Sequence, residues 1–142
     1  ETVLDLGCGS GILSIAALRL GAVSAKAVDI DDKCLTVAYE NAALNGIDRS
    51  RYTVRWGDVL SDQQLKAEIG GGYDMVVANI VADVIIGMAP MFFAKTAEGG
   101  TLICSGILNE RADEVRAALE KAGFEVVNHA KSDDWSAFTA KK

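Results

Sequence analysis

Residues 2–11 read TVLDLGCGSG, a short apolar run followed by three glycines at alternate positions. The apolar run predicts a buried strand, and the glycines predict a sharp turn in which the backbone can approach a ligand closely. A helical pattern follows at residues 12–20 and ends at Gly21. A strand, a glycine turn and a helix in this order are typical of an α/β domain.

The rest of the chain continues this alternation. Runs rich in β-forming residues predict further strands at residues 25–30, 51–56, 73–78 and 101–105, and helical patterns separate most of these strands. The strands expected at residues 124–129 and 135–140 have no helix between them, which predicts an antiparallel hairpin. Periodicity predicts buried positions for Leu44, Trp56 and Trp135, and Asn109 is expected to cap the helix that follows it.

Residues 75–94 are mostly apolar over a length that could span a membrane. Polar Asn79 and Asp83 interrupt this stretch, so a buried strand followed by a helix explains it better. Pro90 predicts that the helix has two pieces, one ending near Gly87 and one starting at Pro90, where the missing N–H costs nothing in a first turn.

Composition indicates a single globular domain over residues 1–142. Hydrophobic residues make up 50% of the chain and charged residues 24%, which excludes a disordered or collagen-like protein. The net charge is −6 and the basic residues are scattered, so broad electrostatic capture of nucleic acid is not expected. Cys8, Cys34 and Cys104 lack metal-ligand spacing, so we expect no metal site and a reducing cytoplasmic location.

Residues 5–11, DLGCGSG, carry the strongest chemical signal. The dinucleotide fingerprint G-x-G-x-x-G is not satisfied, because Ile12 and Ser14 stand where its last glycine would be. Asp29 follows at the tip of the second predicted strand, where a carboxylate can accept both hydroxyls of a ribose. A glycine turn alone would also suit an NAD or flavin domain.

Together these elements resemble the nucleoside-binding half of S-adenosylmethionine-dependent methyltransferases. That resemblance implies an α/β, Rossmann-like fold with three α/β/α layers, a mostly parallel seven-stranded sheet and an antiparallel C-terminal hairpin strand. It also implies that the glycine turn faces the amino-acid part of the cofactor, that Asp29 holds the ribose and that Asp58 contacts the adenine. The full set of expected cofactor-binding residues is Asp5, Gly7, Cys8, Gly9, Gly11, Asp29, Ile30, Asp58 and Asn79.

Asn79 is the expected catalytic residue, because ligands of open α/β sheets bind at the carboxyl ends of strands. Its amide oxygen can accept a hydrogen bond from an attacking amine and orient the lone pair. Many methyltransferases of nucleic acid or glutamine amines carry Asn-Pro-Pro-Tyr here, whereas residues 79–82 read NIVA and lack the aromatic that stacks a flipped base. No dedicated base is visible. His129 and Cys8 are interpreted as packing residues, and Asn41 as a helix-end hydrogen bonder.

Five segments narrow the resemblance to the PrmA family: residues 5–17 (DLGCGSGILSIAA), 28–31 (VDID), 40–46 (ENAALNG), 77–80 (VANI) and 105–108 (SGIL). The resemblance implies methyl transfer from S-adenosylmethionine, with S-adenosylhomocysteine as product. The acceptors would be amino groups, of Lys side chains or the N-terminus, on the eleventh protein of the large ribosomal subunit. Neither direct nucleic-acid binding nor a membrane is expected.

Members of this family normally carry a cofactor-contacting Thr segment and a small substrate-docking domain ahead of the first strand. The chain opens at Glu1 without a signal peptide, so we expect an N-terminally truncated catalytic domain without its substrate-recognition domain. Two alternatives stay open: a methyltransferase acting on RNA or on a small-molecule amine, and a cofactor-binding module without activity.

Overall fold

In the computed structural model, which describes residues 1–142, the chain divides into two units, residues 1–70 and 71–142. The first unit holds three parallel strands in the order β3 (Tyr52–Trp56), β2 (Ser24–Asp29), β1 (Thr2–Leu6). Leu6 pairs with Val28 and Asp29 pairs with Trp56, so the three strands end nearly level. The carboxyl ends of the strands therefore share one edge of this sheet. The helices of the unit are α1 (Ile12–Arg19), α2 (Lys33–Leu44) and α3 (Gln63–Ile69).

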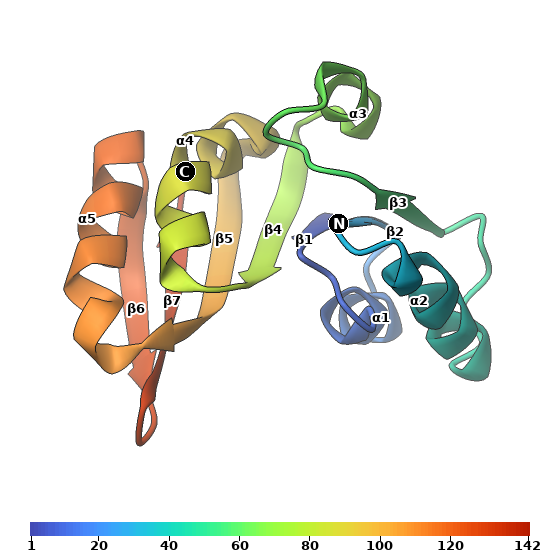
Figure 1. The fold of residues 1–142 in the computed structure, drawn as a ribbon, viewed down its shortest axis with the longest axis horizontal. Coiled ribbons are helices and arrows are strands. Elements are labelled where there is room, and N and C mark those ends of the chain that lie inside the picture. Colours follow the sequence, from blue (N-terminus) through green and yellow to red (C-terminus); the bar gives the residue numbers. More distant parts are fainter. The chain divides into compact units, whose positions relative to one another are not determined.

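The second unit holds four strands. β4 (Tyr73–Asn79) and β5 (Thr96–Leu108) are parallel, β7 (Trp135–Lys141) runs antiparallel to β5, and β6 (Glu125–Lys131) runs antiparallel to β7. Helix α4 (Ala82–Lys95) packs against α5 (Ala112–Ala122), which follows the short 3₁₀ helix η1 (Asn109–Arg111). Figure 1 shows these two helices and the final hairpin. The predicted α/β class and antiparallel hairpin are confirmed.

Burial explains why these runs form strands. The apolar side chains of β1 are buried, as expected for a strand covered on both faces, and Leu102, Cys104 and Phe138 form a buried face in the second unit. Val115 and Leu119 of α5 are buried as well, at the spacing of one helix face.

The prediction of two helical pieces around Pro90 is wrong, because α4 is one helix with Pro90 inside it. Its buried residues lie on both sides of the proline: Ala82, Ile85, Met88, Ala89, Met91 and Phe92. A proline inside a helix costs about 3 kcal/mol, and burial of one large apolar side chain contributes about 1.5–3 kcal/mol, so this apolar face can hold the helix together. No helix of the structure has the length and apolar character that crossing a membrane requires.

Three other side chains differ from the predicted pattern. Leu44 is exposed because it is the last residue of α2, beyond the buried face. Trp56 ends β3 and Trp135 begins β7, and their exposed fractions are 58% and 52%, so neither belongs to the core. Asn109 does not cap α5, because its Oδ1, the atom that a cap would use, accepts instead from the Ser136 hydroxyl at 2.6 Å. Its Nδ2–H donates to carbonyls of the β6–β7 turn.

Candidate functional site

The glycine turn of residues 7–11 joins β1 to α1 in a conformation that L side chains rarely adopt. Gly7, Gly9 and Gly11 have φ values of 78°, 52° and 82°. A Cβ on Gly11 would lie 2.7 Å from the Tyr52 hydroxyl, whereas a Cβ on Gly9 would meet nothing within 4 Å. Packing against Tyr52 therefore requires a glycine at position 11. At position 9 the backbone conformation favours glycine, and the space beside that residue is open.

Asp29 at the end of β2 holds the turn. Its Oδ2 accepts the N–H of Gly9 at 2.8 Å, and its Oδ1 accepts the N–H of Asp31 at 3.0 Å. An ionised carboxylate has about four acceptor positions, so about two remain for a ligand. A vicinal diol, with one hydroxyl for each oxygen, matches this arrangement.

The end of β3 lies beside Asp29. The N–H of Gly57 donates to the Asp29 carbonyl at 2.9 Å, and Trp56 Nε1 donates to the Ile30 carbonyl at 3.0 Å. Oδ1 of Asp58 accepts the N–H of Leu60 at 2.9 Å, which fixes the direction of that carboxylate. The structure thus places Asp29, Ile30 and Asp58 on the same edge as the glycine turn.

Asp5 lies beneath the turn and is buried. Its Oδ2 accepts the backbone N–H of Ser14 at 3.2 Å and also the Ser14 hydroxyl, while its Oδ1 has no hydrogen-bond partner. Burial raises the pKa of the Asp5 carboxyl from 3.8 to about 6, and the charge of Asp29 adds to this effect. Asp5 therefore joins β1 to the first turn of α1.

Two further side chains complete the turn. Cys8 is buried, and burial raises the pKa of its thiol, which opposes formation of the reactive thiolate. The interpretation of Cys8 as a packing residue agrees with this. Asn41 of α2 donates its Nδ2–H to the Ser10 carbonyl at 3.0 Å, so it supports the turn and does not bond at a helix end. No local sequence signal could have found this contact, since 31 residues separate the partners.

Asn79 stands in the second unit, at the carboxyl end of β4, where it pairs with Ser105 of β5. The next residue of β5, Gly106, has φ 80°, and a Cβ on it would lie 2.6 Å from Asn79 Oδ1. Gly106 therefore leaves the space that the Asn79 carboxamide occupies. The motif at residues 105–108 marked this glycine, but only the structure reveals its contact with Asn79.

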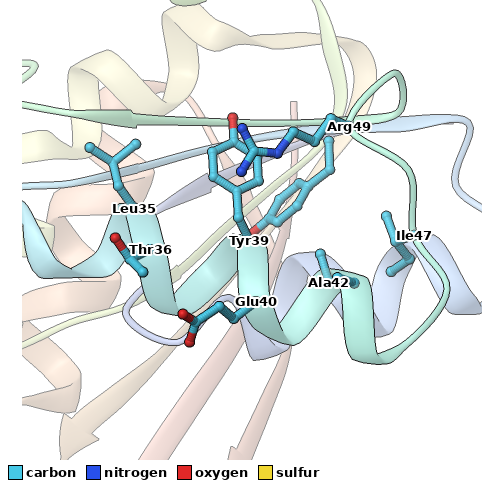
Figure 2. Close-up of a pocket in the computed structure, with 9 residues that line it drawn as sticks. Leu35, Thr36, Tyr39, Glu40, Ala42, Ile47 and Arg49 are labelled. Carbon is cyan, nitrogen blue, oxygen red and sulfur yellow. The ribbon is translucent and has the colours of Figure 1, made fainter.

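A hollow of about 400 Å³ lies in the first unit between α2 and β3 (Figure 2). The Arg49 guanidinium stands over the Tyr39 ring at 3.9 Å, and the Tyr39 hydroxyl accepts the N–H of Val54 at 2.8 Å. Tyr39 thereby occupies a donor on β3, which is the outer strand of this unit. None of the predicted site residues lines the hollow.

His129 makes packing and hydrogen-bond contacts within the final hairpin. Its ring stacks on Phe138 at 4.4 Å, and its Nε2 lies 2.9 Å from Ser136 Oγ. The Ser136 hydroxyl donates to Asn109 Oδ1, so it accepts from an N–H on His129 Nε2. A nucleophilic serine would need the opposite direction, so this pair has a structural role.

Comparison with known proteins relates both units to one family. The family model for ribosomal protein L11 methyltransferase (PrmA) matches residues 1–142. A relative named ribosomal protein L11 methyltransferase, from Agathobacter rectalis, is 44% identical over 142 residues, which cover 99% of this chain and 44% of the relative. The chain thus spans less than half the length of this curated relative.

Solved structures agree in fold. The ribosomal protein L11 methylase from Lactobacillus delbrueckii subsp. bulgaricus matches with a TM-score of 0.88 and 36% identity, over 98% of this chain and 68% of that one. An RNA methyltransferase from Salinibacter ruber, in complex with S-adenosyl-L-homocysteine, matches with a TM-score of 0.71 and 18% identity. The match covers 99% of this chain and 80% of that methyltransferase chain. The predicted Rossmann-like methyltransferase fold, mostly parallel with seven strands, is confirmed.

Proposed function

The chain belongs to the PrmA family of ribosomal protein L11 methyltransferases, and from this we propose that it is the catalytic domain of an S-adenosylmethionine-dependent protein N-methyltransferase. The observation that carries the proposal is the position of Asp29. Its carboxylate holds Gly9 of the glycine turn and keeps acceptor positions for a ribose.

The residues of the first unit fit S-adenosylmethionine. Open space at Gly9 leaves room for the amino-acid part of the cofactor along Gly7, Cys8, Gly9 and Gly11. Asp29 would bind the two ribose hydroxyls, and Ile30 and Asp58 would contact the adenine from the same sheet edge. Asp5 would act beneath the turn, by keeping β1 and α1 in position.

When bound, S-adenosylmethionine supplies a methyl carbon on a positively charged sulfur and leaves as S-adenosylhomocysteine. The acceptor nitrogen forms a bond to this carbon as the carbon–sulfur bond breaks, and the nitrogen then loses a proton to solvent. In-line orientation of the reactants supplies most of the acceleration in such a displacement. Asn79 would orient the nitrogen by accepting one of its N–H groups at Oδ1.

The acceptor amine must be neutral to react. A free Lys amine has a pKa of about 10.4, so the site has to favour the neutral form by desolvation and by neutral acceptors. An amide is such an acceptor, because it binds an N–H without attracting a full positive charge. This supports Asn79 as the catalytic residue without a dedicated base.

We propose a ribosomal protein, the L11-type protein of the large subunit, as the substrate. Family membership supports it, and so do the net charge of −6, which suits a basic protein, and the absence of a base-stacking aromatic from residues 79–82. A ribosomal substrate implies action in the cytoplasm, with neither direct nucleic-acid binding nor a membrane surface.

Radiolabelled methyl transfer tests this proposal. The complete gene product and labelled S-adenosylmethionine are added to an extract of cells that lack the enzyme, and the labelled species are separated. A labelled small basic ribosomal protein is the expected result. Label in RNA or in a small amine would overturn the substrate assignment. Calorimetry that detects no binding of S-adenosylmethionine or S-adenosylhomocysteine at millimolar concentration would overturn the methyltransferase assignment itself.

A further inference from the structure

Asp5 is a buried carboxylate beneath the glycine turn, and only 1% of its surface is exposed. Its Oδ2 accepts the backbone N–H of Ser14 at 3.2 Å and the Ser14 hydroxyl, whereas Oδ1 has no hydrogen-bond partner. The oxygen of a neutral amide could accept the same two hydrogen bonds. The contacts that join β1 to α1 therefore do not require a negative charge at residue 5.

The groups of the first unit that face Asp5 do not compensate its charge. They are the Ser14 hydroxyl of α1, the Cys8 thiol of the turn, the Asp29 carboxylate of β2 and the Tyr52 hydroxyl of β3. None of these four groups carries a positive charge at neutral pH, and Asp29 repels the charge of Asp5. Buried carboxylates are normally paired with a cation, so packing alone does not explain this one.

The Asp5 carboxyl is nevertheless ionised at neutral pH. Burial raises its pKa to about 6, and the hydrogen bonds from Ser14 lower it only in part. The carboxyl is therefore mostly ionised at pH 7 and mostly protonated at pH 5. Because the folded surroundings disfavour this charge, its ionisation destabilises the fold. A positively charged ligand bound against the turn would relieve that unfavourable state.

The turn above Asp5 is open to such a ligand at Gly9. A Cβ on Gly9 would meet nothing within 4 Å, and the Gly9 N–H donates to Asp29 Oδ2 at 2.8 Å. A ligand along Gly9 therefore meets a turn with one carboxylate beneath it, at Asp5, and another beside it, at Asp29. Two carboxylates around one turn favour a cation.

The two ligands of the proposed reaction differ in charge. At neutral pH S-adenosylmethionine carries a sulfonium, an ammonium and a carboxylate, hence one net positive charge. S-adenosylhomocysteine has lost the methyl group and with it the charge on sulfur, so it is neutral overall. An uncompensated carboxylate near the turn therefore attracts the first ligand more strongly than the second.

We propose that the ionised Asp5 carboxylate makes the glycine turn selective for charge, so that it favours S-adenosylmethionine over S-adenosylhomocysteine. The inference rests on the proposed function and deepens it, because it assigns discrimination between cofactor and product to a buried positioning residue. Coulombic attraction acts through the turn and is screened less in a buried site than in water. When the methyl group leaves, the sulfur loses its charge and this attraction ends, which favours release of the product.

Changing the pH switches the charge of Asp5 while the fixed contacts stay in place. We expect the ionised form to bind S-adenosylmethionine about tenfold more tightly than the protonated form, the smaller end of the effect of an opposite charge. With a pKa of about 6 for free Asp5, its association constant should rise about fivefold from pH 5 to pH 7, and binding at pH 5.5 should release about half a proton. S-adenosylhomocysteine should change by less than about twofold, because the amino group of either ligand, with a pKa of about 7.7–8.0, stays protonated.

The test is isothermal titration calorimetry of the complete gene product with both ligands from pH 5 to pH 7. Buffers of different ionisation enthalpy give the number of protons released on binding. The variants are Asp5→Asn, Ser14→Ala and the control Asp48→Asn. Asp48 is a matched control, because it is an exposed carboxylate of the same unit whose Oδ1 accepts the N–H of Ser50 at 2.7 Å, outside the turn.

Asp5→Asn should abolish the proton release and lower the affinity for S-adenosylmethionine at pH 7 about tenfold, with the affinity for S-adenosylhomocysteine within about twofold of wild type. Ser14→Ala should move the midpoint of the pH dependence upward, because the Ser14 hydroxyl lowers the pKa of Asp5. Asp48→Asn should behave as the wild type. A purely structural role of Asp5 predicts instead that Asp5→Asn weakens both ligands equally at every pH.

Failures of the two proposals are distinguishable. A wild-type protein that binds neither ligand overturns the proposed function and this inference with it. Binding of both ligands with the same pH dependence, or with equal losses in Asp5→Asn, overturns the charge selection alone. If Asp5→Asn does not fold, the wild type and Ser14→Ala decide: an absence of proton release with S-adenosylmethionine, or an unmoved midpoint, overturns it.

Discussion

The backbone N–H of Gly9 donates a 2.8 Å hydrogen bond to Oδ2 of Asp29. One carboxylate therefore shapes the glycine turn and also presents acceptors for a ligand at the end of β2. The turn and the proposed ribose site are formed together, so a change at either residue affects both.

Asp29→Ala should weaken the binding of S-adenosylmethionine at least about 100-fold. Hydrogen bonds to a charged group contribute about 1.5–3 kcal/mol each, and the variant loses two with the ribose as well as the one with Gly9. Calorimetry measures the affinity. Asp32→Ala is the control, because Asp32 is an exposed acidic residue just before α2 whose side chain makes no capping hydrogen bond. An equal loss in both variants would contradict the role of Asp29.

Asn79→Ala should lower kcat about 100-fold and change cofactor affinity by less than about threefold. The reason is that loss of orientation at the acceptor nitrogen slows transfer, while the ribose and glycine contacts stay intact. Steady-state kinetics at saturating cofactor provide the measurement, with the exposed Asn128→Ala of β6 as control. If Asn79→Ala and Asp29→Ala each lost turnover and affinity equally, the division of roles would be refuted.

Gly106→Ala should reduce turnover through Asn79. The new Cβ would approach Asn79 Oδ1, and a φ of 80° costs a non-glycine residue about 1–2 kcal/mol of stability. Gly87→Ala is the matched control, because Gly87 lies in α4 with open space around it and gains about 0.5–1 kcal/mol as alanine. Urea unfolding and kinetics, measured on both variants, separate the two effects. Unchanged turnover in Gly106→Ala would refute the link to Asn79.

Asp5→Asn should alter how stability depends on pH. The pKa of the Asp5 carboxyl is 3.8 in the unfolded chain and about 6 in the folded one, so the folded state holds the extra proton between these values. The stability this provides is complete below pH 3.8 and is lost as the pH rises through about 6, a change of about 3 kcal/mol. Urea unfolding from pH 4 to 7 should show the wild type losing stability relative to Asp5→Asn. Parallel curves for the two proteins would contradict the raised pKa.

Local patterns were sufficient for much of the fold and the site. Residues 2–11 predicted β1 and the turn correctly, because an apolar run and positive-φ glycines each constrain their own backbone. The final hairpin followed from the missing helix between its strands. Asp29 could be placed at the sheet edge because parallel strands end together.

Contacts between distant residues could not be predicted in this way. The alternation of polar and apolar residues assigns Trp56 and Trp135 to the apolar face of their strands. It does not show whether neighbouring elements cover the ends of those strands. Both residues lie at strand ends, and both are exposed. The bonds of Asn41 to Ser10 and of Asn109 to Ser132 join residues 31 and 23 positions apart, so no local pattern carries them. The sequence suggested a role at helix ends for Asn41 and Asn109, because asparagine side chains commonly form hydrogen bonds at such ends.

Both tryptophans of the chain are half-exposed, and each belongs to a different unit. Trp56 bonds the carbonyl of Ile30 beside the proposed adenine position, and Trp135 lines a cavity of about 140 Å³ in the second unit. Replacement of either one by phenylalanine leaves a single indole as fluorophore. The two indoles can thus be followed separately, and each reports on the surroundings of its own unit.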